Sequence, residues 1–230
     1  MRIYNSPKEM YEEVKRDLAE MGINVHPSTM QDKWVAEDPN YETKELQNYS
    51  YCLLSPKSSQ IQEQLNVSQP WADEEFKERV ALDLINPGNA YKLREDVWIP
   101  FLHDGKFAYT YNERINFNNQ LDKVLAILKT DPDTRQAWLS IWNPAIDVDN
   151  LGGLSRVPCS LGYAFQIRCG QLNMHYVMRS CDFATHFQND VYLAIKLQEY
   201  VAAVLGCPVG NFTHTIFSLH VYAKDISGVF

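Results

Sequence analysis

The sequence has no excess of basic residues. Its 21 Lys and Arg residues are outnumbered by 29 Asp and Glu residues, which gives a formal net charge of -8 at pH 7. A protein that holds a nucleic-acid backbone needs clustered positive charge, so this balance argues against a nucleic-acid polymer as the ligand. A single phosphate group remains possible because a few local arginines are enough to bind it.

Long hydrophobic runs and paired cysteine motifs are also absent. The apolar runs are far shorter than a membrane span, and no basic start leads into an apolar segment, so we expect neither a membrane protein nor a secreted one. The five cysteines are odd in number and form no CxxC pair. We therefore expect no disulfide framework, no metal site, and a reducing cytoplasm as the compartment.

The 230 residues contain no repeat, low-complexity segment or linker, so we expect a single domain over residues 1–230. Apolar residues recur at helical spacing in the first half of the chain and at strand spacing in the second. Expected helices cover 7–21 (capped by Ser6), a segment from Tyr41 that carries Glu45, 71–85, 116–129 and 190–205. Expected strands cover 97–99, 137–142, 163–168, 172–179 and 217–222, and 55–70 is expected to be a loop. The predicted fold is α/β (α+β), with a mixed β-sheet packed with helices in two layers.

Cys159, in VPCS, lies at the start of a predicted strand. Most single cysteines are small buried hydrophobes. Three arginines, Arg135, Arg156 and Arg179, are close enough in sequence to lower the pKa of this thiol and make it a nucleophile. A cysteine protease would need a partner histidine within a family signature, and none surrounds the histidines of this chain.

Other polar residues suit the binding of a small anionic substrate, although each alone is also compatible with ordinary surface charge or helix capping. Arg179 with Ser180, and Arg135, are candidates for holding phosphate because arginine donates through a planar fork. His220 and Tyr222 alternate along a predicted strand, so both face one side. Together with the acids Glu45, Asp182 and Asp190, they could form one polar site.

The joint order of these residues resembles the thymidylate synthase family from Trp98 to Tyr222. The matching segments are DPDTRQAWLSIWN (131–143), VPCS (157–160), MRSCD (178–182) and SLHVY (218–222), and the separation of Cys159 from Arg179 fits without a gap. KELQNY, around Glu45, is similar to the helix that bears the family's catalytic glutamate. The resemblance implies a thymidylate synthase-like fold.

The resemblance also implies a reaction. The cofactor would be 5,10-methylenetetrahydrofolate and the substrate a pyrimidine deoxynucleoside monophosphate. Cys159 would add to carbon 6 of the pyrimidine and Glu45 would relay protons. The other implied roles are an active-site tyrosine for Tyr109, phosphate binding for Arg135, Arg179 and Ser180, sugar binding for His220 and Tyr222, and folate contacts for Trp98 and Asp182. Because Arg135 would come from the partner subunit, we expect a homodimer.

Asp190 stands where thymidylate synthases typically have asparagine. An asparagine amide matches the N–H donor and carbonyl acceptor of uracil, whereas a carboxylate accepts from the amino group of cytosine. A buried mismatch costs about 1–3 kcal/mol, so Asp190 predicts a cytosine nucleotide. The alternative is that Asp190 only caps the helix that follows.

WVAEDP, MRSCD, the Asn189-Asp190 pair and SLHVY are similar to the branch of bacteriophage deoxycytidylate hydroxymethylases. Hydroxymethylation of deoxycytidylate (dCMP) is therefore the leading prediction. Thymidylate synthesis from deoxyuridylate (dUMP), dCMP methylation and a non-catalytic nucleotide-binding dimer remain open. Gln136 and Ala164 depart from the family pattern, and the sequence ends soon after Tyr222, so a missing lid could admit water for hydroxymethylation.

Overall fold

A mixed, seven-stranded β-sheet is the centre of the fold. The computed structural model describes residues 1–230, and its strands follow the order β1-β5-β9-β8-β7-β6, with β2 paired to β5. The strands are β1 (Arg2–Tyr4), β2 (Ile23–Val25), β5 (Thr43–Leu53), β6 (Trp138–Ser140), β7 (Ser160–Arg168), β8 (Gln171–Asp182) and β9 (Val209–Tyr222). The pairs β1–β5 and β8–β9 are parallel and the others antiparallel. A separate hairpin pairs β3 (Thr29–Met30) with β4 (Lys33–Trp34).

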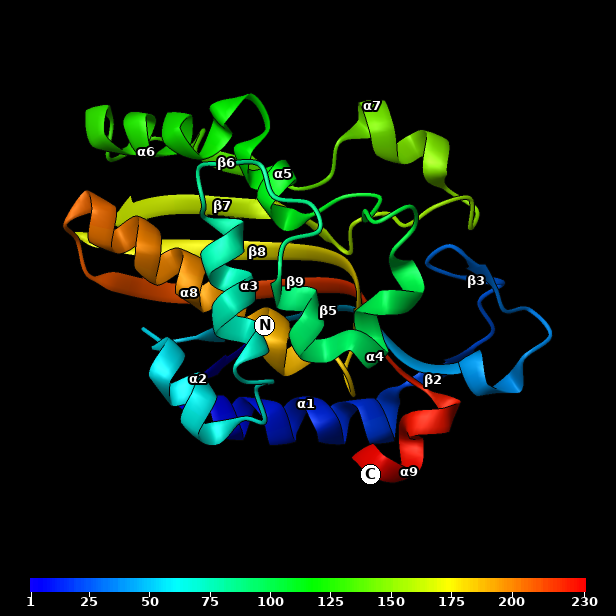
Figure 1. Cartoon of the computed structure of the whole chain (residues 1–230). Helices are drawn as coiled ribbons and strands as arrows, with labels where there is room; N and C mark the ends of the chain where they lie inside the picture. Colours follow the sequence, from blue (N-terminus) through cyan, green and yellow to red (C-terminus); the bar gives the residue numbers. More distant parts are fainter.

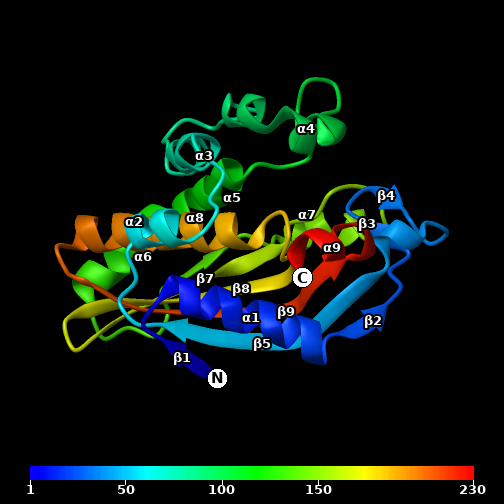
Figure 2. The same ribbon diagram turned by 90° about the horizontal axis from the view of Figure 1, so that it is seen from below.

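Helices gather on one side of this sheet, and no helix covers the opposite side (Figures 1 and 2). The helices are α1 (Pro7–Met21), α2 (Ser58–Gln64), α3 (Trp71–Arg79), α4 (Glu95–Trp98), α5 (Tyr111–Asn116), α6 (Gln120–Thr130), α7 (Pro144–Asp147), α8 (Phe187–Leu205) and α9 (Ile226–Val229). Short 3-10 turns cover Pro39–Tyr41, Ala90–Arg94, Ile99–Phe101, Phe117–Asn119, Val148–Asn150 and Ala223–Asp225. This arrangement confirms the predicted two-layer α/β architecture.

Local signals gave α1, α8 and the central strands correctly. The Ser6 side chain accepts the Glu9 N–H at the start of α1, as expected for an N-cap followed by proline. The long C-terminal helix α8 ends at Gly206, whose φ of 68° is a left-handed conformation that glycine adopts without strain. Both helices have a face of buried apolar residues that packs on the core.

Five expectations about local structure differ from the fold. The segment after Tyr41 is not a helix, because residues 43–53 form β5 between β1 and β9. Residues 97–99 are helical rather than extended, and 55–70 contains α2. The helices expected over 71–85 and 116–129 are shorter, and the second begins only after Asn118 and Asn119, which both have a φ of 52°.

Aromatic rings connect neighbouring strands of the sheet to one another. Tyr163 of β7 stacks on Tyr176 of β8 with ring centroids 4.5 Å apart, and Tyr176 stacks on His214 of β9 at 4.7 Å. His214 is fully buried, and burial lowers its pKa to about 3, so the imidazole stays neutral. Its Nδ1 shares a hydrogen bond of 3.0 Å with the Tyr51 hydroxyl of β5. The stack therefore fixes the strands from which the cleft residues project.

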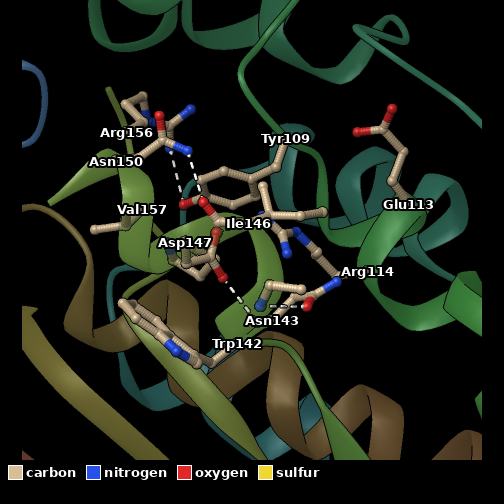
Figure 3. Close-up of polar contacts among 12 residues, drawn as sticks. Tyr109, Glu113, Arg114, Trp142, Asn143, Ile146, Asp147, Asn150, Arg156 and Val157 are labelled. Atoms are coloured by element: carbon tan, nitrogen blue, oxygen red, sulfur yellow. Dashed lines mark hydrogen bonds and ion pairs between the residues drawn. The ribbon is translucent and has the colours of Figure 1, made fainter. Parts of the chain in front are cut away.

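A buried ion pair holds the loop region beyond β6 against α5. Arg114 donates to Asp147 at 2.6 Å, and Asp147 also accepts the Asn143 backbone N–H at 2.7 Å (Figure 3). Arg114 and Asp147 are only 7% and 1% exposed. The Arg114 guanidinium lies 5.3 Å from the centre of the Tyr109 ring. This pair therefore supports one wall of the cleft described below.

We expect Asp147→Ala to lower the free energy of unfolding by about 3–5 kcal/mol, because it leaves the Arg114 guanidinium buried without its acceptor. Urea unfolding followed by circular dichroism measures the loss. Asp149→Ala, at an exposed position in the next turn, is the matched control and should change stability by less than about 0.5 kcal/mol. Equal stability of the two variants would contradict this role for Asp147.

Candidate active site

A single deep cleft, about 710 Å³ in volume, brings together nearly all the residues expected from the sequence. It opens where β5 begins and β8 and β9 end, facing the segment from α3 to Phe101. Among the residues that line it are Glu45, Trp98, Tyr109, Cys159, Arg179, Ser180, Asp182, Asp190, His220 and Tyr222. The volume is that of a pocket for one or two small organic molecules.

Cys159 lies immediately before β7, where the strand is irregular. The register with β8 shifts between Ser160 and Gly162, and a Cβ at Gly162 would lie 2.4 Å from the Trp138 ring, so only glycine fits there. The Cys159 Sγ accepts from Gln31 Nε2 at 3.5 Å and from Arg179 Nη2 at 3.8 Å. Two donors, one of them charged, therefore face a sulfur that is partly open to the cleft.

Arg179 of β8 is fixed to the backbone around the thiol. Its Nε donates to Pro158 O at 2.9 Å and its Nη2 to Val157 O at 3.1 Å, while its own N–H donates to Cys159 O at 2.8 Å. Its Nη1 makes no hydrogen bond within the chain and remains free for a ligand. Ser180 lines the cleft beside it. The pair can hold an anion a short distance from the sulfur.

Asp190 lies in the first turn of α8. Its Oδ2 accepts from Cys181 Sγ at 3.7 Å, and burial, partly offset by Arg79, raises its pKa to about 6. It forms no ion pair within the chain, because Arg79 instead pairs with Glu75 at 2.9 Å. Asp190 therefore has both the place in the first turn of α8 that the helix-capping alternative requires and a place in the lining of the cleft that contains Cys159.

His220 and Tyr222 project from β9 into the cleft, as their alternation predicts. The His220 Nδ1 lies 3.3 Å from Ser218 Oγ, and the Ser218 hydroxyl donates to Glu45. Burial lowers the pKa of His220, so a neutral imidazole is favoured at neutral pH. Burial likewise raises the pKa of Tyr222. Both groups are therefore neutral hydrogen-bonding groups rather than charges.

Glu45 reaches the cleft, but not from the helix predicted for it. It belongs to β5 and lies opposite His220 in the antiparallel register with β9. The helix that this resemblance predicted around KELQNY is therefore wrong, because the segment is a strand. Lys, Glu, Leu and Gln all favour helix, but pairing with two neighbouring strands decides the conformation. The helix on the facing wall of the cleft is α3, which carries Glu75 and Glu78.

Arg135 is the one expected site residue that does not line the cleft. It is exposed in the turn between α6 and β6. A role in the site would have to be played in a second copy, as the predicted homodimer requires.

Several cleft residues were not found from the sequence. Arg79 stacks on the Tyr111 ring at 3.9 Å, and the Tyr111 hydroxyl shares a hydrogen bond of 2.9 Å with Ser160. Gln31 comes from the turn between β3 and β4. Trp71 and Arg94 line the wall beside Trp98. Spacing on one face of α3 could have linked Trp71 with Arg79, but no local signal marks the others.

The raised pKa of Asp190 predicts how stability depends on pH. The folded state holds the proton more tightly than the unfolded chain, so the stabilising protonated form is lost as pH rises from about 4 through about 6. We expect Asp190→Asn to be more stable than the wild type by about 1–3 kcal/mol near pH 8 and about equal near pH 4. Urea unfolding of both proteins across this range measures the difference. A difference independent of pH would contradict burial as its cause.

Comparison with known proteins assigns the chain to a family. The family model described as thymidylate synthase matches residues 62–229. The chain belongs to the thymidylate synthase family. Every expected site residue except Glu45 lies inside the matched range, and members of this family are one-carbon transferases.

Relatives in the thymidylate synthase family support this family assignment over most of the chain. A protein named "Putative thymidylate synthase" from Methanosarcina barkeri is 27% identical over 226 residues and covers 91% of this chain and 94% of its own length. One of the same name from Methanocaldococcus jannaschii is 29% identical over 211 residues, covering 90% and 89%. Thermostable thymidylate synthase A from Bacillus subtilis has the same fold, with a TM-score of 0.74 at 19% identity, covering 97% of this chain and 82% of its own.

The residues of the cleft suit the folate cofactor that the family generally uses. Asp182 Oδ1 accepts the Ala184 N–H at 3.0 Å, whereas its other oxygen has no partner within the chain and can accept from a ligand. Trp98 Nε1 is a buried donor without an acceptor. One free acceptor and one free donor therefore belong to residues that line the cleft. None of the helices is long and apolar enough to cross a membrane.

Proposed function

We propose that this member of the thymidylate synthase family transfers a one-carbon unit to carbon 5 of a pyrimidine deoxynucleoside monophosphate through a covalent bond to Cys159. The observation that supports this proposal is the meeting, in one cleft, of a donor-flanked thiol, a fixed arginine and a half-buried carboxylate of raised pKa. These groups are those that nucleophilic attack, phosphate binding and base recognition require.

The proposed roles follow from the contacts of each side chain. The Cys159 thiolate, to which Gln31 and Arg179 donate, attacks carbon 6 and makes carbon 5 electron-rich. When bound, 5,10-methylenetetrahydrofolate supplies the one-carbon unit. Trp98 and Asp182 would hold that cofactor. The return of the thiolate as leaving group then completes the cycle.

Proton transfer at the base needs a carboxylate or hydroxyl close to the ring. Glu45 is the proposed relay and would act through Ser218, which donates to it, and through water. Tyr109 would position the ring from the opposite wall, since its hydroxyl accepts from Arg156 at 3.5 Å. Glu75 on α3 is the alternative relay, because a glutamate-bearing helix is what the family resemblance implied and α3 is the acidic helix beside the cleft.

Substrate binding would use the phosphate and the sugar of the nucleotide. Arg179 and Ser180 would bind the phosphate, and Arg135 from a second copy would complete the site in a homodimer. The side of the sheet without helices offers a surface for that copy (Figure 2). His220 and Tyr222 would bind the sugar hydroxyl as neutral groups.

Two bases are candidates. The names of the relatives support dUMP and a thymidylate synthase reaction better than they support a hydroxymethylase. Asp190 is the observation that favours dCMP, and with it 5-hydroxymethylation, because a carboxylate that lines the cleft can accept from an exocyclic amino group. The product and the preferred base are therefore separate questions for experiment.

One type of incubation identifies both the product and the preferred base. The protein is given labelled dUMP or dCMP with methylenetetrahydrofolate, and the products are separated. Methylation consumes the cofactor as reductant and leaves dihydrofolate, whereas hydroxymethylation adds water and returns tetrahydrofolate. Hydrogen exchange at carbon 5 measures the covalent step alone. Binding of either nucleotide without exchange at carbon 5 would contradict catalysis and support a non-catalytic nucleotide-binding protein.

A further inference from the structure

Besides Arg179, two arginines of the cleft form no ion pair, although the protein carries a net charge of -8. Arg94 and Arg156 line the cleft and form no ion pair. Arg156 is only 8% exposed, and its one hydrogen bond within the chain is to the Tyr109 hydroxyl at 3.5 Å. A buried charge is normally paired because its desolvation is costly. The proposed roles of Arg179 and Asp190 leave these two arginines unexplained.

Aromatic rings separate the two guanidinium groups. Arg94 lies 4.8 Å from the centre of the Trp71 ring, Trp71 stacks on Trp98 at 6.0 Å, and Arg156 lies 5.2 Å from the centre of Trp98. We call these four residues the Arg–Trp stack. Cation–π contacts stabilise the positive charge of the arginines but provide no acceptor for their N–H groups in the guanidinium plane. The stack thus fixes the positions of the two guanidinium groups but leaves their N–H donors without acceptors.

Each member of the Arg–Trp stack has a buried donor without an acceptor: Arg94 Nη1, Trp71 Nε1, Trp98 Nε1 and Arg156 Nε. Arginine and tryptophan side chains have donors only, so they cannot satisfy one another. The nearby acids Asp96, Asp182 and Asp190 line the same cleft but lie beyond ion-pair distance. His186, whose ring lies 5.9 Å from Trp98, is a neighbour that burial keeps neutral.

We propose that the Arg–Trp stack is a second anion site in the cleft, distinct from the phosphate site at Arg179 and Ser180. It would take a carboxylate or phosphate group, whose oxygens accept from several donors at once. For the identity of the ligand, this inference rests on the proposed function. That function offers two sources of the anion: a glutamyl carboxylate of the folate, or a second phosphate on the nucleotide.

The experiment uses the full chain and the variant Arg156→Met, which keeps length and removes charge. Calorimetry measures affinity for tetrahydrofolate with and without its glutamyl group, and for the nucleoside mono- and diphosphate. We expect Arg156→Met to weaken binding of the glutamylated folate about tenfold or more and of the glutamate-free analogue by less than about twofold. If the diphosphate rather than the folate shows this loss, the anion belongs to the nucleotide.

Two control variants distinguish the effect of the lost charge on affinity from the effect of changed packing. Arg16→Met, at an exposed ion pair on α1, should leave all affinities unchanged. Arg156→Lys should recover part of the lost affinity, because it restores the charge but not the fork. Equal losses for charged and uncharged ligands, or no loss for any ligand, would overturn the anion site.

Inorganic phosphate makes the test independent of the proposed function. It should raise the melting temperature of the wild type more than that of Arg156→Met. Such a difference in a protein that binds neither folate nor nucleotide would support the anion site and refute the proposed reaction. Turnover of a nucleotide without any dependence of ligand or phosphate binding on Arg156 would support the reaction and refute the second site.

Discussion

We expect Cys159→Ser to lower kcat by about a thousandfold or more while nucleotide affinity stays within a few-fold of the wild type. A serine hydroxyl is a far weaker nucleophile than a thiolate at neutral pH, so the covalent step fails. Binding survives because Arg179 is held by the carbonyls of Val157 and Pro158, which the substitution does not touch. The large loss in rate is therefore expected without a loss of the phosphate site.

Single-turnover rates and calorimetric nucleotide affinities measure these two effects separately. The matched control is Cys169→Ser, because Cys169 is exposed in the turn between β7 and β8. Its activity should equal that of the wild type. A Cys159→Ser protein that turns over nucleotide within about tenfold of the wild-type rate would exclude covalent catalysis by this thiol.

The second large effect is a change of base preference in Asp190→Asn. We expect the ratio of kcat/KM for dUMP to kcat/KM for dCMP to rise about tenfold or more. The amide supplies one donor and one acceptor, which match the carbonyl and ring N–H of uracil, whereas the carboxylate supplies acceptors alone. Burial raises the pKa of Asp190 to about 6, so the discrimination by the wild type should also increase as pH rises above that value.

Competition between the two nucleotides in one reaction gives this ratio directly, free of errors in enzyme concentration. Asp122→Asn, exposed on α6, makes the same chemical change away from the cleft and should leave the ratio unchanged. If Asp190→Asn lowers both values of kcat/KM equally, Asp190 supports the structure of the cleft and does not read the base.

Much of the fold was predictable where the signal was local. Ser6, Pro7 and the apolar stripe of α1 lie within one short segment, and the same is true of α8 and Gly206. Residues 43–53 show the limit of such signals. Their helix-forming residues suggested the wrong element because β5 is stabilised by pairing with β9, whose residue His220 is far from Glu45 in sequence.

The residues of the candidate site likewise divide into those that the sequence predicted and those that it did not. Cys159, Arg179 and Asp190 were found because their spacing is carried by β7, β8 and the start of α8, which follow one another along the chain. Arg79, Arg94 and Gln31 come from separate segments and have no motif of their own. These three residues reach the cleft only because α3 packs on α5 and α8, the turn Ala90–Arg94 packs on α3, and the β3–β4 turn places Gln31 beside Cys159.

The sequence alone determined which reactive groups exist, in what order, and that the second half of the chain forms strands around a buried helix. The tertiary structure decided which of those groups face one another: Glu45 beside His220, Arg135 outside the cleft, and the Arg–Trp stack inside it. The physical reason is that side-chain chemistry is a property of single residues. Burial and contact, in contrast, arise from pairing and packing between segments distant in sequence, which no local pattern encodes.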